Sequence, residues 1–157
     1  MNYMAIYKTS LADGVGWRTV LFVSGCNHKC KGCHNPESWN KNAGYPFTEK
    51  TKQVLFECLS KDYINGLTIS GGDPLYKDNL LTITELCKEI KEKFPNKTIW
   101  VYTGSLYRDI KTLELMKYID VIVDGKFKIN KKDTTLAYRG SSNQRIIDVK
   151  TGKQLNY

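Results

Sequence analysis

The chain has 157 residues, of which 41% are hydrophobic and 25% are charged. These proportions are typical of a compact globular domain and exclude a fibrous or largely disordered protein. No run approaches the ~20 apolar residues of a membrane span, and the first residues lack a basic-then-apolar secretion signal. We therefore expect one domain over residues 1–157, located in the cytoplasm and without membrane contact.

The net charge is +8, and most of it comes from residues 88–157, with 15 basic and 8 acidic side chains. Such a bias can mark a nucleic-acid surface or docking onto an acidic protein. Here the lysines are scattered among acidic residues and few aromatic residues stand between them. We therefore expect a solvated lysine-rich surface and no nucleic-acid partner.

Short apolar runs alternate with helix-like segments, and this pattern favours an α/β fold with a mainly parallel sheet. The expected strands are rich in β-branched and aromatic residues and cover 19–23, 67–69, 98–102, 119–123 and 145–149.

Three amphipathic helices are expected between these strands. The first follows an N-cap at Thr48, the second lies between Lys77 and Pro95, and the third follows the strand at 98–102. Their apolar stripes are Val54, Leu55, Cys58 and Leu59; Leu80, Ile83, Cys87, Ile90 and Phe94; and Leu106, Ile110, Leu113 and Met116.

Each of the first four expected strands runs into a small polar residue and a glycine, at 24–26, 70–73, 103–105 and 124–126. The carboxyl ends of parallel strands share one edge, where α/β proteins bind their ligands. One such loop is also compatible with a tight strand-to-helix turn. Four together favour one extended site.

Three cysteines, Cys26, Cys30 and Cys33, follow the first expected strand with spacings of three and then two residues. Thiolates are the ligands of iron–sulfur clusters, and a short loop with this spacing can wrap around one cluster. No fourth cysteine lies nearby, so a 4Fe-4S cluster held here would keep one iron open, as a catalytic site requires.

Other interpretations of the cysteines stay open. A zinc site could be completed by His28 or His34. Disulfides are disfavoured, because five cysteines are an odd number in a chain without a secretion signal. Cys58 and Cys87 lie on apolar helix stripes, where a free cysteine behaves as a small core residue.

The cysteine motif resembles that of the radical S-adenosylmethionine superfamily, and further segments resemble its branch of activating proteins for anaerobic ribonucleoside-triphosphate reductase. The resemblance implies an α/β single-domain incomplete (β/α) barrel with a mainly parallel sheet, of the radical S-adenosylmethionine type. The matching segments lie in order along nearly the whole chain: DGVGWR at 13–18, FVSGCNHKCKGCHNP at 22–36, LTISGGDP at 67–74, WVYTG at 100–104, VDGKF at 123–127 and RGSSNQRIIDV at 139–149.

The same resemblance assigns expected roles to matching residues. Cys26, Cys30 and Cys33 would ligate the cluster and carry the catalysis. The residues expected to contact S-adenosylmethionine are Gly32, Cys33 and His34 near the adenine, Gly71, Gly72 and Asp73 at the methionyl ammonium, Thr103 and Gly104 at the cofactor's border, Lys126 or else Arg139 at the carboxylate, and Asp124. For Asp124, capping of backbone is an equal alternative.

The resemblance further implies an oxidoreductase that cleaves S-adenosylmethionine to methionine and a 5′-deoxyadenosyl radical. That radical would generate a glycyl radical on the large subunit of anaerobic ribonucleoside-triphosphate reductase. Its implied partners are this reductase and an external one-electron donor such as flavodoxin, in a homodimer or in a heterotetramer with the reductase. Another glycyl-radical enzyme or a small molecule as substrate, and a zinc-stabilised binding module, are the alternatives.

The stretch from Asp124 to Arg145 is lysine-rich and longer than most connections within a domain. We expect it to receive the glycine loop of the reductase, with Lys128, Lys131 and Lys132 contributing to the contact. Trp39 and Tyr45 would either line the opening of the barrel or pack in the core.

Overall fold

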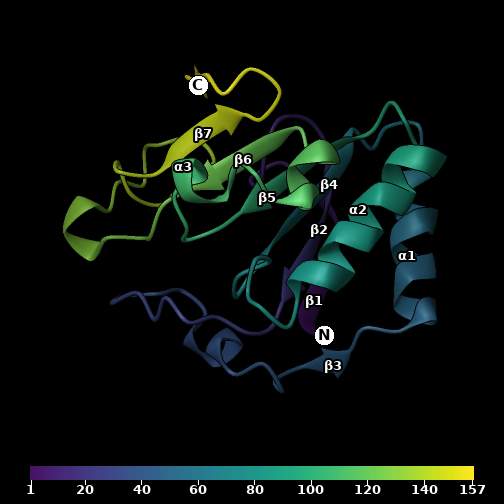
Figure 1. Cartoon of the computed structure of the whole chain (residues 1–157), viewed down its shortest axis with the longest axis horizontal. Helices are drawn as coiled ribbons and strands as arrows, with labels where there is room; N and C mark the ends of the chain where they lie inside the picture. The colour runs from purple at the N-terminus through teal and green to yellow at the C-terminus, as the bar shows by residue number, and fades with distance from the viewer.

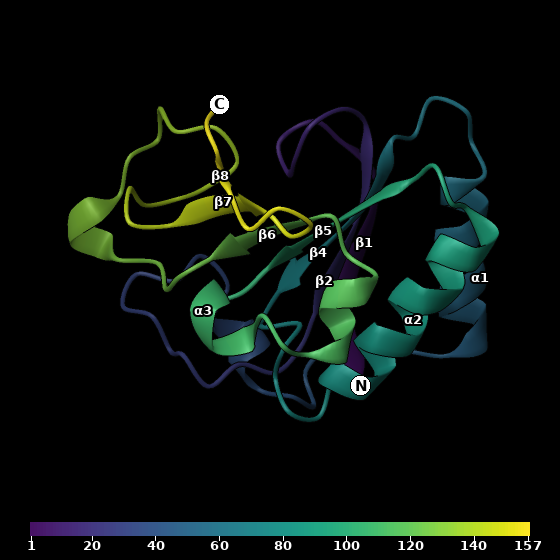
Figure 2. The same ribbon diagram turned by 45° about the horizontal axis from the view of Figure 1, so that its top comes forward.

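A computed structural model describes residues 1–157, and its centre is one eight-stranded sheet (Figures 1 and 2). The strand order is β3-β1-β2-β4-β5-β6-β7-β8. The strands are β1 Asn2–Ser10, β2 Arg18–Val23, β3 Tyr45–Pro46, β4 Gly66–Gly71, β5 Thr98–Tyr102, β6 Val121–Asp124, β7 Arg145–Asp148 and β8 Gln154–Leu155. None of the helices has the length and apolar character needed to cross a bilayer.

The expected α/β class is confirmed, and parallel pairing holds in the centre of the sheet, where β2, β4, β5 and β6 lie side by side. The pairs at both edges are antiparallel, including β7 on β6. β1, β3 and β8 were not expected, because β1 is half-buried without clean alternation and the other two have two residues each. The sheet is therefore mixed and mostly parallel in its centre, and the incomplete (β/α) barrel expected from the resemblance is not confirmed.

The first two expected helices are confirmed as α1 Glu49–Leu59 and α2 Leu80–Lys93. α1 begins with a capping box, in which the side chains and backbone amides of Thr48 and Thr51 bond each other reciprocally. α2 ends at Lys93, two residues before Pro95, because a proline disfavours helical backbone at the residue that precedes it. Of the expected stripe on α1, only Val54 is exposed.

The third expected helix is wrong as a single element. The segment forms a short helix α3, Tyr107–Ile110, and a separate 3-10 turn η2, Glu114–Lys117, because Leu113 between them is extended. Ile110, Leu115 and Met116 are nevertheless buried. Two short turns therefore bury the same apolar side chains that one continuous helix would have buried. The remaining 3-10 turns are η1 Pro36–Trp39 and η3 Ile129–Lys131.

The two faces of the sheet are covered differently. Helices α1 and α2 and turn η2 pack on one face, where alternate strand residues such as Leu21, Ile69 and Val101 form the main core with them. The opposite face carries a smaller cluster around Trp100 and Val123, packed against Tyr138 from the C-terminal segment. Figure 2 shows α1 and α2 side by side on one side of the strands. One face of the sheet is thus left free of helices.

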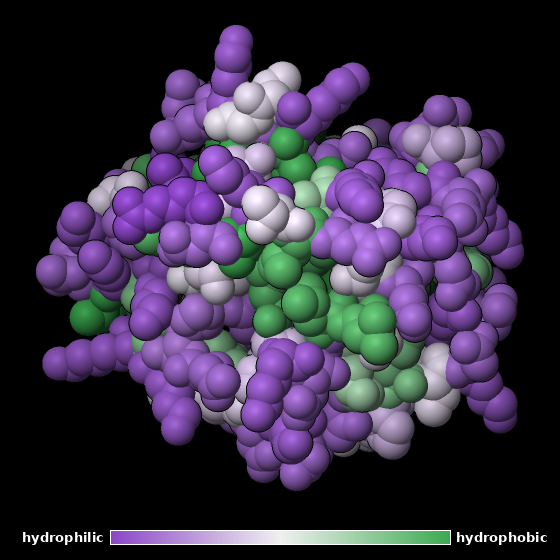
Figure 3. All heavy atoms as spheres, in the orientation of Figure 1, coloured by the Kyte–Doolittle hydropathy of each residue, from purple (hydrophilic) through white to green (hydrophobic).

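The surface is mostly hydrophilic. Figure 3 shows charged and polar side chains over most of the face seen in Figure 1, with one apolar band across its middle. Most lysines of the C-terminal half, including Lys88, Lys93, Lys117 and Lys150, are exposed, and they lie on several separate elements. This distribution agrees with a solvated basic surface.

Arg18 is a buried cation at the start of β2. It is 0% exposed and donates hydrogen bonds to Leu67 O, Thr68 Oγ1, Thr98 O, Thr98 Oγ1 and Val15 O at 2.7–3.2 Å. Burial lowers the pKa of its guanidinium to about 10, and the carboxylates of Asp120 and Asp13 oppose that shift. The five acceptors belong to β4, β5 and the loop before β2, so one side chain joins these segments.

We expect Arg18→Met to lower the free energy of unfolding by about 3 kcal/mol, because several buried oxygen acceptors lose their donor together. Urea unfolding of both proteins measures the difference. Arg108→Met is the matched control, since Arg108 is exposed and its substitution should change the unfolding midpoint little. Equal midpoints for Arg18→Met and the parent protein would contradict this account of the buried guanidinium.

Candidate functional site

The carboxyl ends of the parallel strands meet at one edge of the sheet, as the sequence predicts. The register of β2 on β4 places Val23 beside Gly71. Beyond these residues the backbone continues to pair, with Gly72 N donating to Val23 O at 2.7 Å and Asp73 N to Gly25 O at 2.8 Å. A Cβ atom on Gly72 would lie 2.5 Å from Gly25 O, so only glycine permits this approach.

A cavity of about 370 Å³ opens at this edge and extends along the helix-free face of the sheet. This volume lies in the range of small-molecule sites. The walls include Phe22 and Tyr102 from the strands and Asp13 from the β1–β2 loop. Eight residues expected to form the site line it: Cys26, Cys30, Cys33, His34, Gly71, Gly72, Thr103 and Gly104.

The cysteine loop carries three unpaired thiols on one wall of this cavity. Cys26 is buried, whereas Cys30 and Cys33 are half-buried. The amide of His28 donates to Cys26 Sγ at 3.4 Å, and positive φ angles at Lys29 and Gly32 turn the chain between the cysteines. Soft thiol donors with an amide directed at one sulfur suit an iron–sulfur cluster, so these three residues could hold one.

No disulfide forms among the five cysteines, as expected. Nor do three or more histidine, cysteine or acidic side chains converge as a site for a single metal ion. The two histidines that could have completed a zinc site have other contacts. His28 bonds Asp73, and the ring of His34 packs 5.6 Å from that of Phe127.

The thiols differ in pKa because they differ in burial. Burial raises the pKa of the Cys26 thiol, while the amides of His28 and Lys29 act in the opposite direction. Burial raises the pKa of the Cys87 thiol far more, since this side chain is 0% exposed in the core between α2 and the sheet. Both remaining cysteines are buried on their helices, as expected; Cys87 lies within the main core, whereas Cys58 is 9% exposed and lies outside that cluster.

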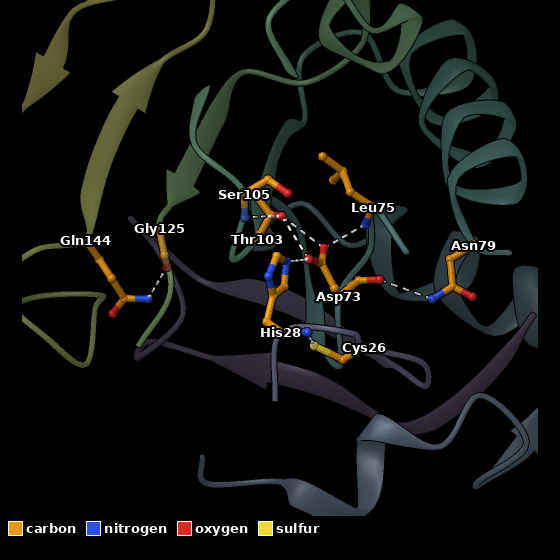
Figure 4. A network of polar contacts seen from close by, with 9 residues as sticks. All are labelled: Cys26, His28, Asp73, Leu75, Asn79, Thr103, Ser105, Gly125 and Gln144. Atoms are coloured by element: carbon orange, nitrogen blue, oxygen red, sulfur yellow. Dashed lines mark hydrogen bonds and ion pairs between the residues drawn. The ribbon is translucent and has the colours of Figure 1, made fainter. Parts of the chain in front are cut away.

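Asp73 lies behind the cavity wall and does not line it. The residue is 3% exposed, and its carboxylate accepts hydrogen bonds from His28 Nε2, the Leu75 amide and the Thr103 hydroxyl (Figure 4). Its side chain therefore points into the protein, between the cysteine loop and the loops that follow β4 and β5.

Three other expected contacts also lie outside the cavity. The carboxylate of Asp124 is fully buried and accepts from the Tyr107 amide at 2.7 Å and from the guanidinium of Arg145. Of the two roles considered for Asp124, cofactor contact and backbone capping, the structure therefore has capping. The capped amide belongs to α3 and not to the loop that follows Asp124. Lys126 is exposed. Gly32 has a φ of 77°, a backbone conformation that favours glycine, and its nearest side chain is that of Ile129.

Several wall residues come from a segment in which the sequence predicted only Lys126, or else Arg139, as a cofactor contact. Phe127, Gly140 and Gln144 line the cavity and belong to the long connection between β6 and β7. Gln144 holds this wall together, because Oε1 accepts from the Gly140 and Ser141 amides and Nε2 donates to Gly125 O (Figure 4). The matching segments VDGKF at 123–127 and RGSSNQR at 139–145 contain these three wall residues and were the signal that could have found them.

The sequence left open whether Trp39 and Tyr45 line the opening or pack in the core, and the structure gives the two residues different places. Trp39 lines the cavity. Tyr45 is 63% exposed on the edge strand β3, with its ring 5.9 Å from that of Tyr3, so it lies neither in the core nor at the cavity.

Residues 12–147 match the family model of the 4Fe-4S single cluster domain. The chain therefore belongs to this class of iron–sulfur proteins. Among curated proteins, it is 50% identical to the anaerobic ribonucleoside-triphosphate reductase-activating protein of Enterobacteria phage T4, over 93% of each chain. The proteins of the same name from Pasteurella multocida and Escherichia coli K12 are 44% and 40% identical, over 93% of this chain and 96% and 97% of theirs. At this identity and coverage, the chain is a member of the family of anaerobic ribonucleoside-triphosphate reductase-activating proteins.

We expect native-state alkylation of the cluster-free, reduced protein to follow the exposure and pKa of its thiols, because the thiolate is the nucleophile. Cys30 and Cys33 should react first, Cys26 more slowly, and Cys87 only after unfolding. Iodoacetamide labelling followed by peptide mass spectrometry measures the order. Labelling of Cys87 in the folded protein at the rate of Cys30 would contradict the described core.

Proposed function

We propose that this protein activates anaerobic ribonucleoside-triphosphate reductase by cleaving S-adenosylmethionine at a reduced 4Fe-4S cluster and generating a glycyl radical on the reductase. One observation carries the proposal. Three unpaired cysteines from one loop and the glycine-rich ends of β4 and β5 line the same cavity, in a chain up to 50% identical to reductase-activating proteins.

Cys26, Cys30 and Cys33 would hold the cluster, leaving one iron without a protein ligand for the cofactor. When bound and reduced by an external one-electron donor such as flavodoxin, the cluster supplies the electron that cleaves the sulfonium into methionine and a 5′-deoxyadenosyl radical. The protein's own contribution is to bind, orient and shield the reactants, and no general base is required.

The cofactor's polar groups have candidate partners on the cavity wall. Backbone carbonyl groups at Gly71 and Gly72 would accept from the methionyl ammonium, and Thr103 and Gly104 would border the cofactor. For the carboxylate we favour Arg139 over Lys126. Arg139 adjoins the wall residue Gly140, and its Nε is buried without a hydrogen-bond partner, whereas Lys126 is exposed outside the cavity.

The aromatic walls would keep water from the radical. Phe22, Trp39 and Phe127 line the cavity from three separate segments of the chain. Phe127 also packs on His34 of the cysteine loop. An apolar enclosure limits side reactions of a reactive intermediate, which is the main hazard of carbon-radical chemistry.

The partner would be the large subunit of the reductase, and its glycine loop would enter beside the β6–β7 connection. This connection forms one cavity wall through Phe127, Gly140 and Gln144. Its outer side carries the exposed Lys128, Lys131 and Lys132. A chain that presents its glycine at this wall would pass close to the cysteine loop.

Reduced, reconstituted protein should release 5′-deoxyadenosine from S-adenosylmethionine, and Cys30→Ala should abolish the product because the cluster loses one of its three thiolates. Anaerobic assay with dithionite and chromatographic detection of the nucleoside measures this. Cys87→Ala is the matched control, since Cys87 lies in the core away from the cavity. Full activity of Cys30→Ala would overturn the assignment of the cluster.

The same assay with the reductase added distinguishes the proposed substrate from the alternatives. A glycyl-radical doublet in the electron paramagnetic resonance spectrum is expected only when the protein, the cofactor and the reductase are all present. Formation of deoxyadenosine without that doublet would point to another glycyl-radical enzyme or a small molecule as substrate.

Reversing the charges in Lys128→Glu/Lys131→Glu/Lys132→Glu should weaken the complex with the reductase about tenfold or more, by removing attraction for an acidic docking surface. Binding is measured by pull-down or calorimetry at low salt. The exposed Lys88→Glu/Lys93→Glu/Lys117→Glu variant, with the same change in net charge, is the control. Unchanged affinity of the first variant would reject this docking site.

A further inference from the structure

Few hydrogen bonds tie residues 27–34 of the cysteine loop to the rest of the protein. Two backbone hydrogen bonds hold the start of the loop, from Gly25 N to Ser38 O and from Cys26 N to Trp39 O. Within 27–34 the remaining hydrogen bonds are internal to the loop, from His28 N to Cys26 Sγ and from Cys33 N to Cys30 O. The side chain of His28 makes the one hydrogen bond from residues 27–34 to a residue outside the cysteine loop.

That bond joins His28 Nε2 to Asp73 Oδ2 at 2.5 Å (Figure 4). The side chain of His28 is 19% exposed and that of Asp73 is 4% exposed, so little water competes for either partner. The imidazole ring also lies flat against Gly104, where a Cβ atom would come within 2.5 Å of His28 Cδ2. The loop after β5 is thus shaped to receive this ring.

The carboxylate of Asp73 is engaged by three donors from the protein itself. Oδ2 accepts from His28, Oδ1 accepts from the Leu75 amide at 2.8 Å, and the Thr103 hydroxyl lies 3.0 Å from Oδ1 and 3.1 Å from Oδ2, so its one hydrogen is shared between them. With three donors on a buried carboxylate, Asp73 is directed at its protein partners and not at the cavity. The main chain of Asp73 is held as well, because Asn79 Nδ2 donates to its carbonyl.

We propose that His28 is a positioning residue that fastens the cysteine loop to the ends of β4 and β5 through Asp73, and that Asp73 acts through this bond and not as a direct ligand of the cofactor. We call the hydrogen bond between His28 and Asp73 the anchor. His28 lies between Cys26 and Cys30 in the sequence and lines the same cavity as Gly71, Gly72 and Gly104. It therefore sets where a group held by the cysteines lies relative to the glycines. The consequence for cofactor binding rests on the proposed function, whereas the anchor itself does not.

The anchor can be tested on cluster-free protein, because Lys29 and Lys31 are exposed trypsin sites inside the loop. His28→Ala should raise the rate of cleavage after these lysines about tenfold, since local opening no longer breaks a hydrogen bond to a charged group. His28→Gln should restore slow cleavage, because its side-chain amide can donate to Asp73 from a similar position. The melting temperature should change little, as the opening is local.

Asp73→Ala should speed cleavage as well, and the double variant with His28→Ala should be no faster than the faster single variant. All proteins are compared at a temperature at which each is fully folded, since Asp73→Ala also removes the acceptor for Leu75 and Thr103. Lys41→Ala is the control, because it removes an exposed ion pair with Asp78 outside the loop. Equal cleavage of His28→Ala and the parent protein, or no rescue by His28→Gln, would overturn the anchor.

A second readout uses reconstituted protein and separates this proposal from the function it extends. Binding of S-adenosylmethionine should alter the electron paramagnetic resonance spectrum of the reduced cluster in the parent protein and in His28→Gln, and less so in His28→Ala. A normal change in His28→Ala with loss only in Asp73→Ala would show Asp73 contacting the cofactor and reject our assignment. No change in the parent protein would reject the proposed function, and the trypsin result would still decide the anchor.

Discussion

The parallel pairing of β2, β4 and β5 is the constraint on which the rest of the structure depends. It brings the carboxyl ends of three strands to one edge, so that the cysteine loop, Gly71 and Thr103 share a cavity although they are distant in sequence. The pairing continues past the strands, where Gly72 approaches Gly25 so closely that no side chain fits between them. At the opposite end of these strands, the buried guanidinium of Arg18 joins β4 and β5 to the loop before β2.

The helix-covered face of the sheet holds the core that stabilises the fold, and the opposite face holds the cavity. Most of the apolar core lies on the helical face, including Leu59 and Cys87, which are both fully buried. The other face keeps space for the cavity and is closed by aromatic side chains and by the β6–β7 connection. A site built in this way can change its walls without disturbing the core that supports it.

The acidic residues at the strand ends turn away from the cavity. Asp73 binds His28 and Thr103, and Asp124 binds Arg145 and the Tyr107 amide. Besides the thiols, the cavity wall therefore consists of glycines, imidazole rings, aromatic side chains and uncharged polar residues, with Asp13 as its one acidic residue. Fewer carboxylates near the cysteines mean less repulsion of the negative charge that thiolates and an iron–sulfur cluster bring.

The sequence by itself determined the α/β class, the central parallel strands, helices α1 and α2 and the place of the cysteine motif directly after β2. These features are local: a repeating apolar pattern, a capping threonine and a fixed cysteine spacing each act within a short stretch of chain. Only the tertiary structure decided that β1, β3 and β8 widen the sheet, that the third helix breaks at Leu113, and that Asp73 and Asp124 face inward. Those outcomes depend on partners distant in the chain, such as His28 for Asp73 and Arg145 for Asp124, and a pattern read along one strand or helix does not contain them.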